Sequence, residues 1–173
     1  VMKTAAPGVA HKSDGGGVLL GISHEDAARA GWASLADRFG PRVVVQRQVP
    51  TAGAVELLVG LTVDPQFGPL LAVGLGGVWV EALNDVAHAL APIDEPAALA
   101  LLARLRGGPL LDGFRGAPPV DRAAVARAVA AFSRLAVLAP WLAAAEVNPL
   151  IAGPTGAVGV DALVVPRANA RLR

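Results

Sequence analysis

Short apolar runs alternate along the chain with segments in which apolar residues recur at helical spacing. The order is strand, glycine loop, strand, helix, three or four strands, two helices and a final strand pair. Because helices do not alternate strictly with strands, a doubly wound parallel sheet is disfavoured and an α+β fold is predicted. The predicted strands are residues 1–3, 18–22, 43–50, 55–63, 69–73, 141–149 and 157–165, and the predicted helices are residues 23–39, 94–106 and 121–139.

Particular side chains define these helices. Ser23 is expected to cap the first helix, with Asp26 at the capping-box position, because a hydroxyl oxygen accepts hydrogen bonds from first-turn N–H groups. Trp32 is expected in the core. Leu99, Leu102 and Leu105 recur at helical spacing and predict a buried stripe on the second helix.

The strand at residues 141–149 carries polar side chains within an apolar run. Glu146 and Asn148 are separated by Val147, so in an extended strand their side chains share one face. Pro149 cannot donate a ladder hydrogen bond, and the strand is expected to end there.

A hairpin follows this strand. Residues 153–156 have the composition of a turn, and residues 157–165 form the returning strand. The hairpin would bring Asp161 beside Glu146 and Asn148. Two carboxylates and an amide oxygen suit Mg²⁺, which favours oxygen ligands. The alternative is that all three side chains are solvated at a strand end, a turn and a sheet edge.

A polar loop ending in three glycines occupies residues 11–17. Successive glycines allow several backbone N–H groups to point at one anion, and Lys3 and Lys12 would add positive charge. The alternative is a flexible hairpin turn. His11 is a candidate phosphoryl acceptor, or else a solvated or capping residue.

Three glycines also fall within four residues at Gly74, Gly76 and Gly77. Glycine weakens strands, so this density indicates a close backbone approach, either to a ligand or within a bulge or tightly packed sheet. Glu56 lies in an apolar strand and must pair, face solvent or bind a ligand. The strand at residues 43–50 turns polar at its end, where backbone and apolar groups suit an adenine ring.

Composition narrows the function classes. The 173 residues are 54% hydrophobic and 17% charged, as expected of one or two folded domains. A net charge of +1 provides no overall positive field to attract nucleic acid or a membrane surface. With 4% aromatic residues and no Tyr, a surface for base stacking is not expected either. The absence of Cys excludes disulfides and thiol chemistry. With no apparent membrane span or signal peptide, a cytoplasmic location is expected.

The motifs together occur in one order along essentially the whole chain. They are Lys3, residues 11–18, Glu56 with Gly60, residues 64–69, residues 74–77 with Glu81 and Asp85, residues 113–116, and residues 146–150 with Asp161. In this order they resemble the ATP-grasp domains of ADP-forming (NDP-forming) acyl-CoA synthetases and, more distantly, the beta subunit of succinyl-CoA synthetase.

This resemblance implies an ATP-grasp fold with two α+β subdomains around a nucleotide cleft, residues 1–57 and 58–173. The chain begins inside a strand, so the N-terminal part of the first subdomain is expected to be truncated. The resemblance also implies ATP and Mg²⁺ as cofactors. The implied nucleotide contacts are Lys3, Lys12, Gln46, Val49, Glu56, Gly76 and Gly77, and the implied metal site is Asn148 and Asp161 with Glu146 in support.

The implied reaction converts an acid, CoA and ATP to acyl-CoA, ADP and phosphate, with His11 relaying a phosphoryl group. It requires CoA-binding and phosphohistidine-bearing domains, fused or as a separate subunit, so this chain alone is expected to be inactive. Apolar faces left uncovered by a missing segment would drive either formation of a homo-oligomer or disorder. The alternative function is a non-catalytic regulatory module, as in the synthetase-like regions of protein lysine acetyltransferases.

Overall fold

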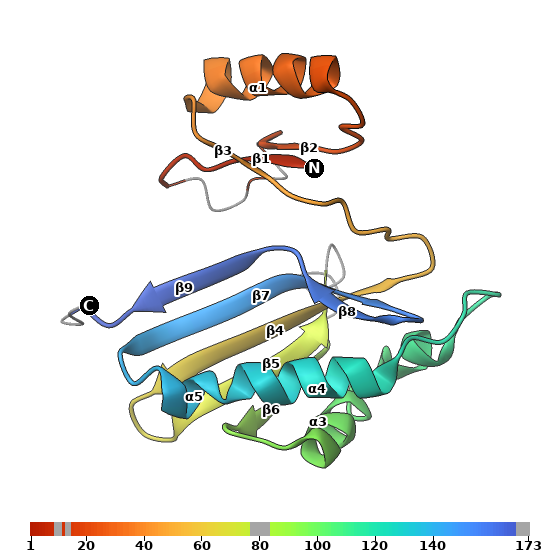
Figure 1. The fold of residues 1–173 in the computed structure, drawn as a ribbon. Helices are drawn as coiled ribbons and strands as arrows, with labels where there is room; N and C mark the ends of the chain where they lie inside the picture. The colour runs from red at the N-terminus through yellow and green to blue at the C-terminus, as the bar shows by residue number, and fades with distance from the viewer. Residues whose placement is uncertain (9–11, 13–14, 77–83, 169–173) are drawn as a thin grey trace. The chain divides into compact units, whose positions relative to one another are not determined.

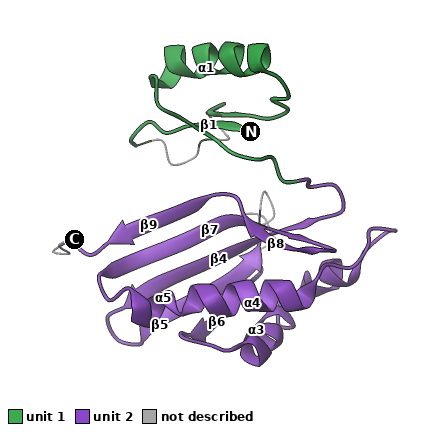
Figure 2. Ribbon diagram, in the orientation of Figure 1, with its two compact units in different colours: residues 1–49 green, residues 50–173 purple. Residues whose placement is uncertain are grey.

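The chain forms two compact units in a computed structural model that describes residues 1–8, 12, 15–76 and 84–168. Unit 1 is Val1–Val49 and unit 2 is Pro50–Arg173 (Figure 2). The subdomain boundary predicted between residues 57 and 58 stays a prediction.

Unit 1 pairs a small antiparallel sheet with one helix (Figure 1). The sheet has the order β2-β1-β3, with β1 in the middle. Helix α1 approaches this sheet closely at Gly31, where a Cβ would lie 3.2 Å from Leu19 Cδ1 and 3.8 Å from Met2 Sδ. The elements are β1 Met2–Thr4, β2 Val18–Leu19, α1 Glu25–Phe39 and β3 Val43–Val45.

The predicted cap of α1 is wrong by one residue. His24, not Ser23, occupies the N-cap position, and its Nδ1 accepts a hydrogen bond from Ala27 N–H at 3.2 Å. The neutral imidazole nitrogen therefore satisfies one of the first-turn donors that a hydroxyl was expected to satisfy. The helix ends at Gly40, whose φ of 89° favours glycine.

Unit 2 contains a six-stranded sheet with the order β6-β5-β4-β7-β8, in which β9 also pairs with β7. All of these pairings are antiparallel, and α3 and α4 lie on one face of the sheet (Figure 1). Strand β6 was not predicted from the sequence. The elements are β4 Val55–Asp64, β5 Gly68–Leu75, β6 Val86–Leu90, α3 Glu95–Leu102, the 3₁₀ helix η1 Gly108–Asp112, α4 Arg122–Ser133, α5 Leu135–Leu138, β7 Leu142–Gly153, β8 Gly156–Gly159 and β9 Ala162–Pro166.

Strict alternation along β4 separates the two faces of this sheet. Leu57, Val59 and Leu61 are buried in the core that α3 and α4 cover, together with Val125 and Val129 of α4. Burying each such side chain contributes about 1.5–3 kcal/mol. The remaining positions of β4 therefore point to the opposite face, which we call the distal face.

Two side chains predicted to be buried are exposed. Trp32 is 46% exposed, and its indole N–H donates to Pro41 O at 3.1 Å, so the ring lies along the surface of unit 1. Leu99 is 41% exposed, because α3 turns Leu101 and Leu102 toward the sheet instead. The predicted helix over residues 94–106 ends at Leu102, and the other two residues of the predicted stripe, Leu102 and Leu105, are buried as expected. No helix among the described residues is both long and apolar enough to cross a bilayer.

The C-terminal hairpin forms as predicted, except that β7 does not end at Pro149. Strand β7 continues to Gly153, and its pairing with β4 shifts by one residue opposite Leu58. This bulge accommodates the proline, whose carbonyl still accepts from Val160 N–H at 3.1 Å. The turn at residues 153–156 is confirmed, and β8 and β9 form the returning strand.

Asp85 ties the start of β6 to the turn after α3. Its carboxylate, only 6% exposed, accepts hydrogen bonds from Arg106 N–H at 2.9 Å and Gly107 N–H at 2.7 Å. A Cβ on Gly107 would lie 2.4 Å from Leu75 Cδ1, so this turn packs directly against β5.

We expect Asp85→Ala to lower the free energy of unfolding of unit 2 by about 2–4 kcal/mol, because two backbone donors lose a charged acceptor. Urea denaturation measures this change. The control is Asp112→Ala, since Asp112 is exposed and paired with Arg122, and its loss is expected to cost less than about 1 kcal/mol. Equal effects of the two substitutions would contradict the role of Asp85.

Candidate functional site

The distal face of unit 2 carries one continuous row of side chains across five strands. The register pairs His88 with Ala72, Ala72 with Gly60, Gly60 with Glu146 and Glu146 with Leu163. With strands about 4.8 Å apart, His88 and Glu146 are separated by roughly 14 Å. The two residues between them, Ala72 and Gly60, are small, so the surface is recessed at the centre of the row.

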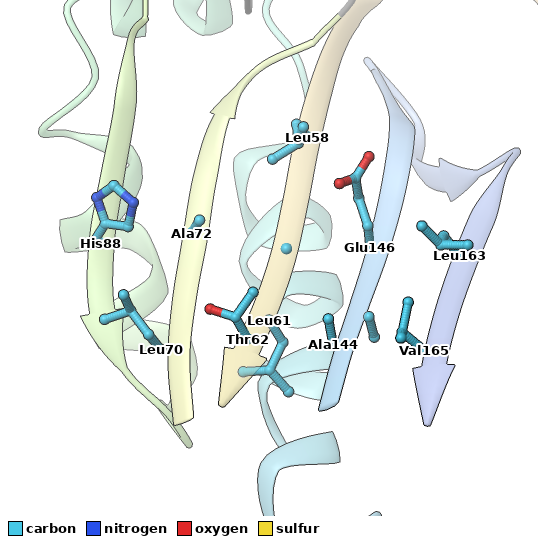
Figure 3. Close-up of a pocket in the computed structure, with 12 residues that line it drawn as sticks. Leu58, Leu61, Thr62, Leu70, Ala72, His88, Ala144, Glu146, Leu163 and Val165 are labelled. Atoms are coloured by element: carbon cyan, nitrogen blue, oxygen red, sulfur yellow. The ribbon is translucent and has the colours of Figure 1, made fainter. Parts of the chain in front are cut away.

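This low centre is a hollow of about 290 Å³ (Figure 3). Its floor includes Gly60, Ala72 and Ala144, while His88 and Glu146 stand on opposite sides of it. Leucine and valine side chains supply much of the remaining lining. The result is a mainly apolar depression with a carboxylate on one side and an imidazole on the other.

The distal face is acidic. None of the six strands of this sheet contains Lys or Arg. Glu56 and Glu146 lie on this face and are half-buried, and neither forms an ion pair within the part of the chain that the structure describes. A partly buried carboxylate without a basic partner lowers the stability of a fold, so its presence indicates a functional role. This arrangement favours a bound cation.

Asp161 lies beside Asn148, as the hairpin prediction required. Asn148 N–H donates to Asp161 O at 3.2 Å, and the pairing of Glu146 with Leu163 continues the same register. Strand alternation places Glu146 on the distal face, and the pairing of Val147 with Ala162 leaves Asn148 next to Asp161 just beyond the end of β9. The Asp161 carboxylate also accepts from Ala162 N–H at 3.0 Å, which orients it.

This donor set fits a hard cation. It offers two carboxylates and one amide oxygen, the ligand types that Mg²⁺ takes alongside water and phosphate. Among the described residues, no group of three or more His, Asp or Glu side chains forms a metal cluster by itself. The assignment of Glu146, Asn148 and Asp161 as metal ligands stays a prediction.

Gly74 near the end of β5 and Gly76 just after it have a packing explanation. A Cβ on Gly74 would lie 2.9 Å from Asp85 O, and one on Gly76 would lie 2.9 Å from the Glu56 carbonyl carbon. Gly76 N–H also donates to Glu56 O at 2.6 Å. Backbone-to-backbone contact therefore accounts for both residues, and it fixes the backbone of Glu56. Gly77 and Glu81 lie outside the described residues.

In unit 1, Lys3 occupies the middle strand of the sheet. The register places it between Val18 of β2 and Val44 of β3. Because Met2 lies against α1, alternation puts the Lys3 side chain on the other face of this sheet. A cation flanked by two valines is a suitable contact for a nucleotide phosphate.

The glycine run folds back on Lys12. Gly17 N–H donates to Lys12 O at 2.6 Å, and Thr4 N–H donates to Gly17 O at 2.8 Å. These bonds fix the end of the loop against β1, next to Lys3. His11, the predicted phosphoryl acceptor, lies outside the described residues.

The predicted adenine contacts follow β3 rather than lie in it, because β3 ends at Val45. Gln46 is exposed, Val49 is half-buried, and the backbone of Gln46 exchanges hydrogen bonds with Val1 at 2.9 and 3.0 Å. Backbone groups and an apolar side chain are therefore both present at this strand end.

His88 was missed as a site residue. It was interpreted as structural or surface, and it is exposed, but it also lines the hollow. No sequence signal indicated this, because residues 86–90 were not predicted to be a strand and the facing position of His88 depends on the β5–β6 register.

Comparison with known proteins identifies the family. The chain matches the ATP-grasp domain family over residues 1–165. It belongs to that family. It is also 35% identical over 175 residues to the beta subunit of ADP-forming acetate–CoA ligase I of Pyrococcus furiosus, covering 95% of this chain and 74% of that subunit. It is therefore the ATP-grasp portion of an ADP-forming acyl-CoA synthetase.

Longer relatives and solved structures agree with this assignment. The chain is 36% identical to ADP-forming acetate–CoA ligase I of Archaeoglobus fulgidus, covering 93% of this chain but only 24% of that protein. Among structures, it resembles a dinucleotide-forming acetyl-coenzyme A synthetase of Ca. Korarchaeum cryptofilum in complex with coenzyme A and Mg-AMPPCP, with a TM-score of 0.85 and 37% identity, over 96% of this chain and 76% of that one. The predicted ATP-grasp fold is confirmed.

Substitution of Gly76 or Gly60 by alanine is expected to change the stability of this ATP-grasp domain in opposite directions. Gly76→Ala should destabilise unit 2 by about 1–3 kcal/mol, because its Cβ would overlap the backbone of Glu56 and Leu57. Gly60→Ala should be neutral or stabilising by up to about 1 kcal/mol, because the nearest atom to its Cβ is 3.9 Å away. Urea denaturation of the two variants tests the pair, and a larger loss at Gly60 would contradict the packing explanation.

Proposed function

We propose that this ATP-grasp domain binds ATP with Mg²⁺ and takes part in phosphoryl transfer within an ADP-forming acyl-CoA synthetase. The observation that carries the proposal is the acidic distal face, on which Glu56 and Glu146 lie half-buried on a sheet whose strands contain no Lys or Arg, with Asp161 beside Asn148 just before β9. The related Ca. Korarchaeum cryptofilum structure, a complex with coenzyme A and Mg-AMPPCP, supports the same ligands.

Asn148 and Asp161 would hold the metal ion, with Glu146 supporting them. When bound, Mg²⁺ neutralises negative charge on the phosphates of the nucleotide. The sheet supplies rigidity: Asn148 and Asp161 are fixed relative to each other by the hydrogen bond between their backbones. Rigid placement matters because phosphoryl transfer depends mainly on positioning and charge neutralisation.

Basic residues of unit 1 would contact the phosphates. Lys3 projects from the central strand of its sheet, and Lys12 is placed by the bond that its carbonyl receives from Gly17. Ammonium groups stabilise phosphate charge as point charges. Gln46 and Val49 would contact the adenine, and Glu56, Gly76 and Gly77 would complete the nucleotide contacts.

The overall reaction would convert an acid, CoA and ATP to acyl-CoA, ADP and phosphate. His11 would accept a phosphoryl group, forming a P–N bond as a P–O bond breaks. The chain spans about three quarters of the related beta subunit and about a quarter of the longer ligase. CoA-binding and phosphohistidine-bearing domains, fused or in a separate subunit, would supply the remaining steps.

We expect Asp161→Asn to reduce Mg²⁺-dependent acyl-CoA synthesis by the complete enzyme by about 100-fold or more, because the substitution removes a charge from the metal site. The amide oxygen can still accept from Ala162 N–H, so the local fold is retained. ADP release measured against Mg²⁺ concentration gives the result.

Asp64→Asn is the matched control. Asp64 also accepts backbone hydrogen bonds, from Gln66 and Phe67, but it lies in the turn at the far end of β4. This variant should retain activity. Normal turnover in Asp161→Asn would refute the metal assignment.

His11→Ala tests the proposed phosphoryl relay. We expect it to abolish the acid-labile, base-stable phosphorylation of this domain by γ-labelled ATP, because an imidazole nitrogen is the nucleophile. His24→Asn is the control, since His24 is an exposed histidine that serves as the N-cap of α1, a position that asparagine also fills. Labelling that survives in His11→Ala would show that His11 is not the acceptor.

A further inference from the structure

Arg38 holds the glycine run of unit 1 from the end of α1. Its Nη2 donates to Gly15 O at 2.7 Å, and its Nη1 lies 3.5 Å from Gly16 O. The side chain also lies over the ring of Phe39, 5.0 Å from its centroid, and it is the basic residue of the last helical turn. The guanidinium thus joins the last turn of the helix to two consecutive carbonyls of the loop.

Because the peptide bond is planar, the contact between Arg38 and the Gly15 carbonyl also fixes the direction of the Gly16 N–H. In a trans peptide, the carbonyl of one residue and the N–H of the next point in opposite directions. By holding Gly15 O toward the end of α1, Arg38 turns Gly16 N–H the other way. Gly16 O is held in the same manner, and Gly17 N–H accordingly points to Lys12 O at 2.6 Å.

Without such a restraint, consecutive glycines would sample many conformations. Glycine loses more backbone entropy on ordering than any other residue. Gly16 adopts a φ of 67°, which favours glycine, and a Cβ there would lie 3.0 Å from Arg38 Nη1, so the guanidinium packs closely against this residue. Ordering the loop before a ligand arrives lowers the entropic cost of binding.

We propose that Arg38 is a positioning residue for nucleotide binding: it orients the Gly16 N–H toward the nucleotide phosphates by holding the Gly15 and Gly16 carbonyls. The inference rests on the proposed function, since it concerns the same ligand. It assigns to Arg38 an action through the loop backbone rather than direct contact with the nucleotide.

The test is calorimetric binding of AMPPCP with Mg²⁺ to the complete enzyme. We expect Arg38→Ala to raise the Kd about five- to tenfold, the effect of one lost hydrogen bond. Arg38→Lys should behave like Arg38→Ala, because a single ammonium keeps the charge but cannot reproduce the planar fork. Both variants should still unfold in a cooperative urea transition of this ATP-grasp domain, which a general loss of folding would not allow.

The matched control is Arg29→Ala, on the same helix. Arg29 pairs with Glu25, and both side chains are 75% exposed, so its removal should leave AMPPCP binding unchanged. An Arg38→Lys variant that binds as tightly as the unmodified enzyme would overturn the inference, because charge alone would then suffice. Unchanged binding in Arg38→Ala would overturn it as well.

Gly16→Ala provides a second route if Arg38→Ala folds poorly. Its methyl group would displace the guanidinium, so it should weaken AMPPCP binding, and adding Arg38→Ala should cause little further loss. Fully additive effects would overturn the inference. If the unmodified enzyme does not bind AMPPCP, the proposed function fails and the inference with it; if it binds and every variant binds equally, only the inference fails.

Discussion

The antiparallel pairing of β7 with β4 on one side and β9 on the other is the constraint on which the site in unit 2 depends. Side chains alternate between faces along a strand, so a slip of one residue would exchange the core and distal faces. The buried side chains Leu57, Val59 and Leu61 fix the register, because each must reach the core under α3 and α4. The same register then determines that Glu146 points away from the core.

The two faces of the unit 2 sheet have different roles, one in stabilising the fold and the other in forming the candidate site. The apolar face of the sheet provides the stabilising burial, while the distal face carries half-buried carboxylates on strands that contain no basic residue. Glu146 points away from the core and contributes nothing to its packing. A site of this kind is expected to be stabilised by its ligand and to be less favourable without it.

The backbone departs from regular geometry at three places: the bulge in β7, the glycines at the end of β5 and the glycine run of unit 1. The bulge at Asn148 and Pro149 lets β7 continue past a residue that cannot donate, so Leu150 returns to the core face. Gly74 and Gly76 allow β5 to approach the backbone of neighbouring segments closely. In unit 1, Arg38 restrains a run of glycines that would otherwise be flexible. In each case a particular residue type, a proline, a glycine or an arginine, determines the backbone geometry next to a predicted site residue.

The sequence by itself determined the fold class, most elements and the C-terminal hairpin, because strand alternation, helical spacing and turn residues are local signals. It also indicated Glu146, Asn148 and Asp161, since polar residues in an apolar strand are visible without a structure. Only the tertiary structure decided that β7 passes Pro149, that His24 caps α1, and that Trp32 and Leu99 are exposed. It alone brought His88 to the hollow and Arg38 to the glycine run. These features depend on strand register and on contacts between residues distant in sequence, which no local pattern encodes.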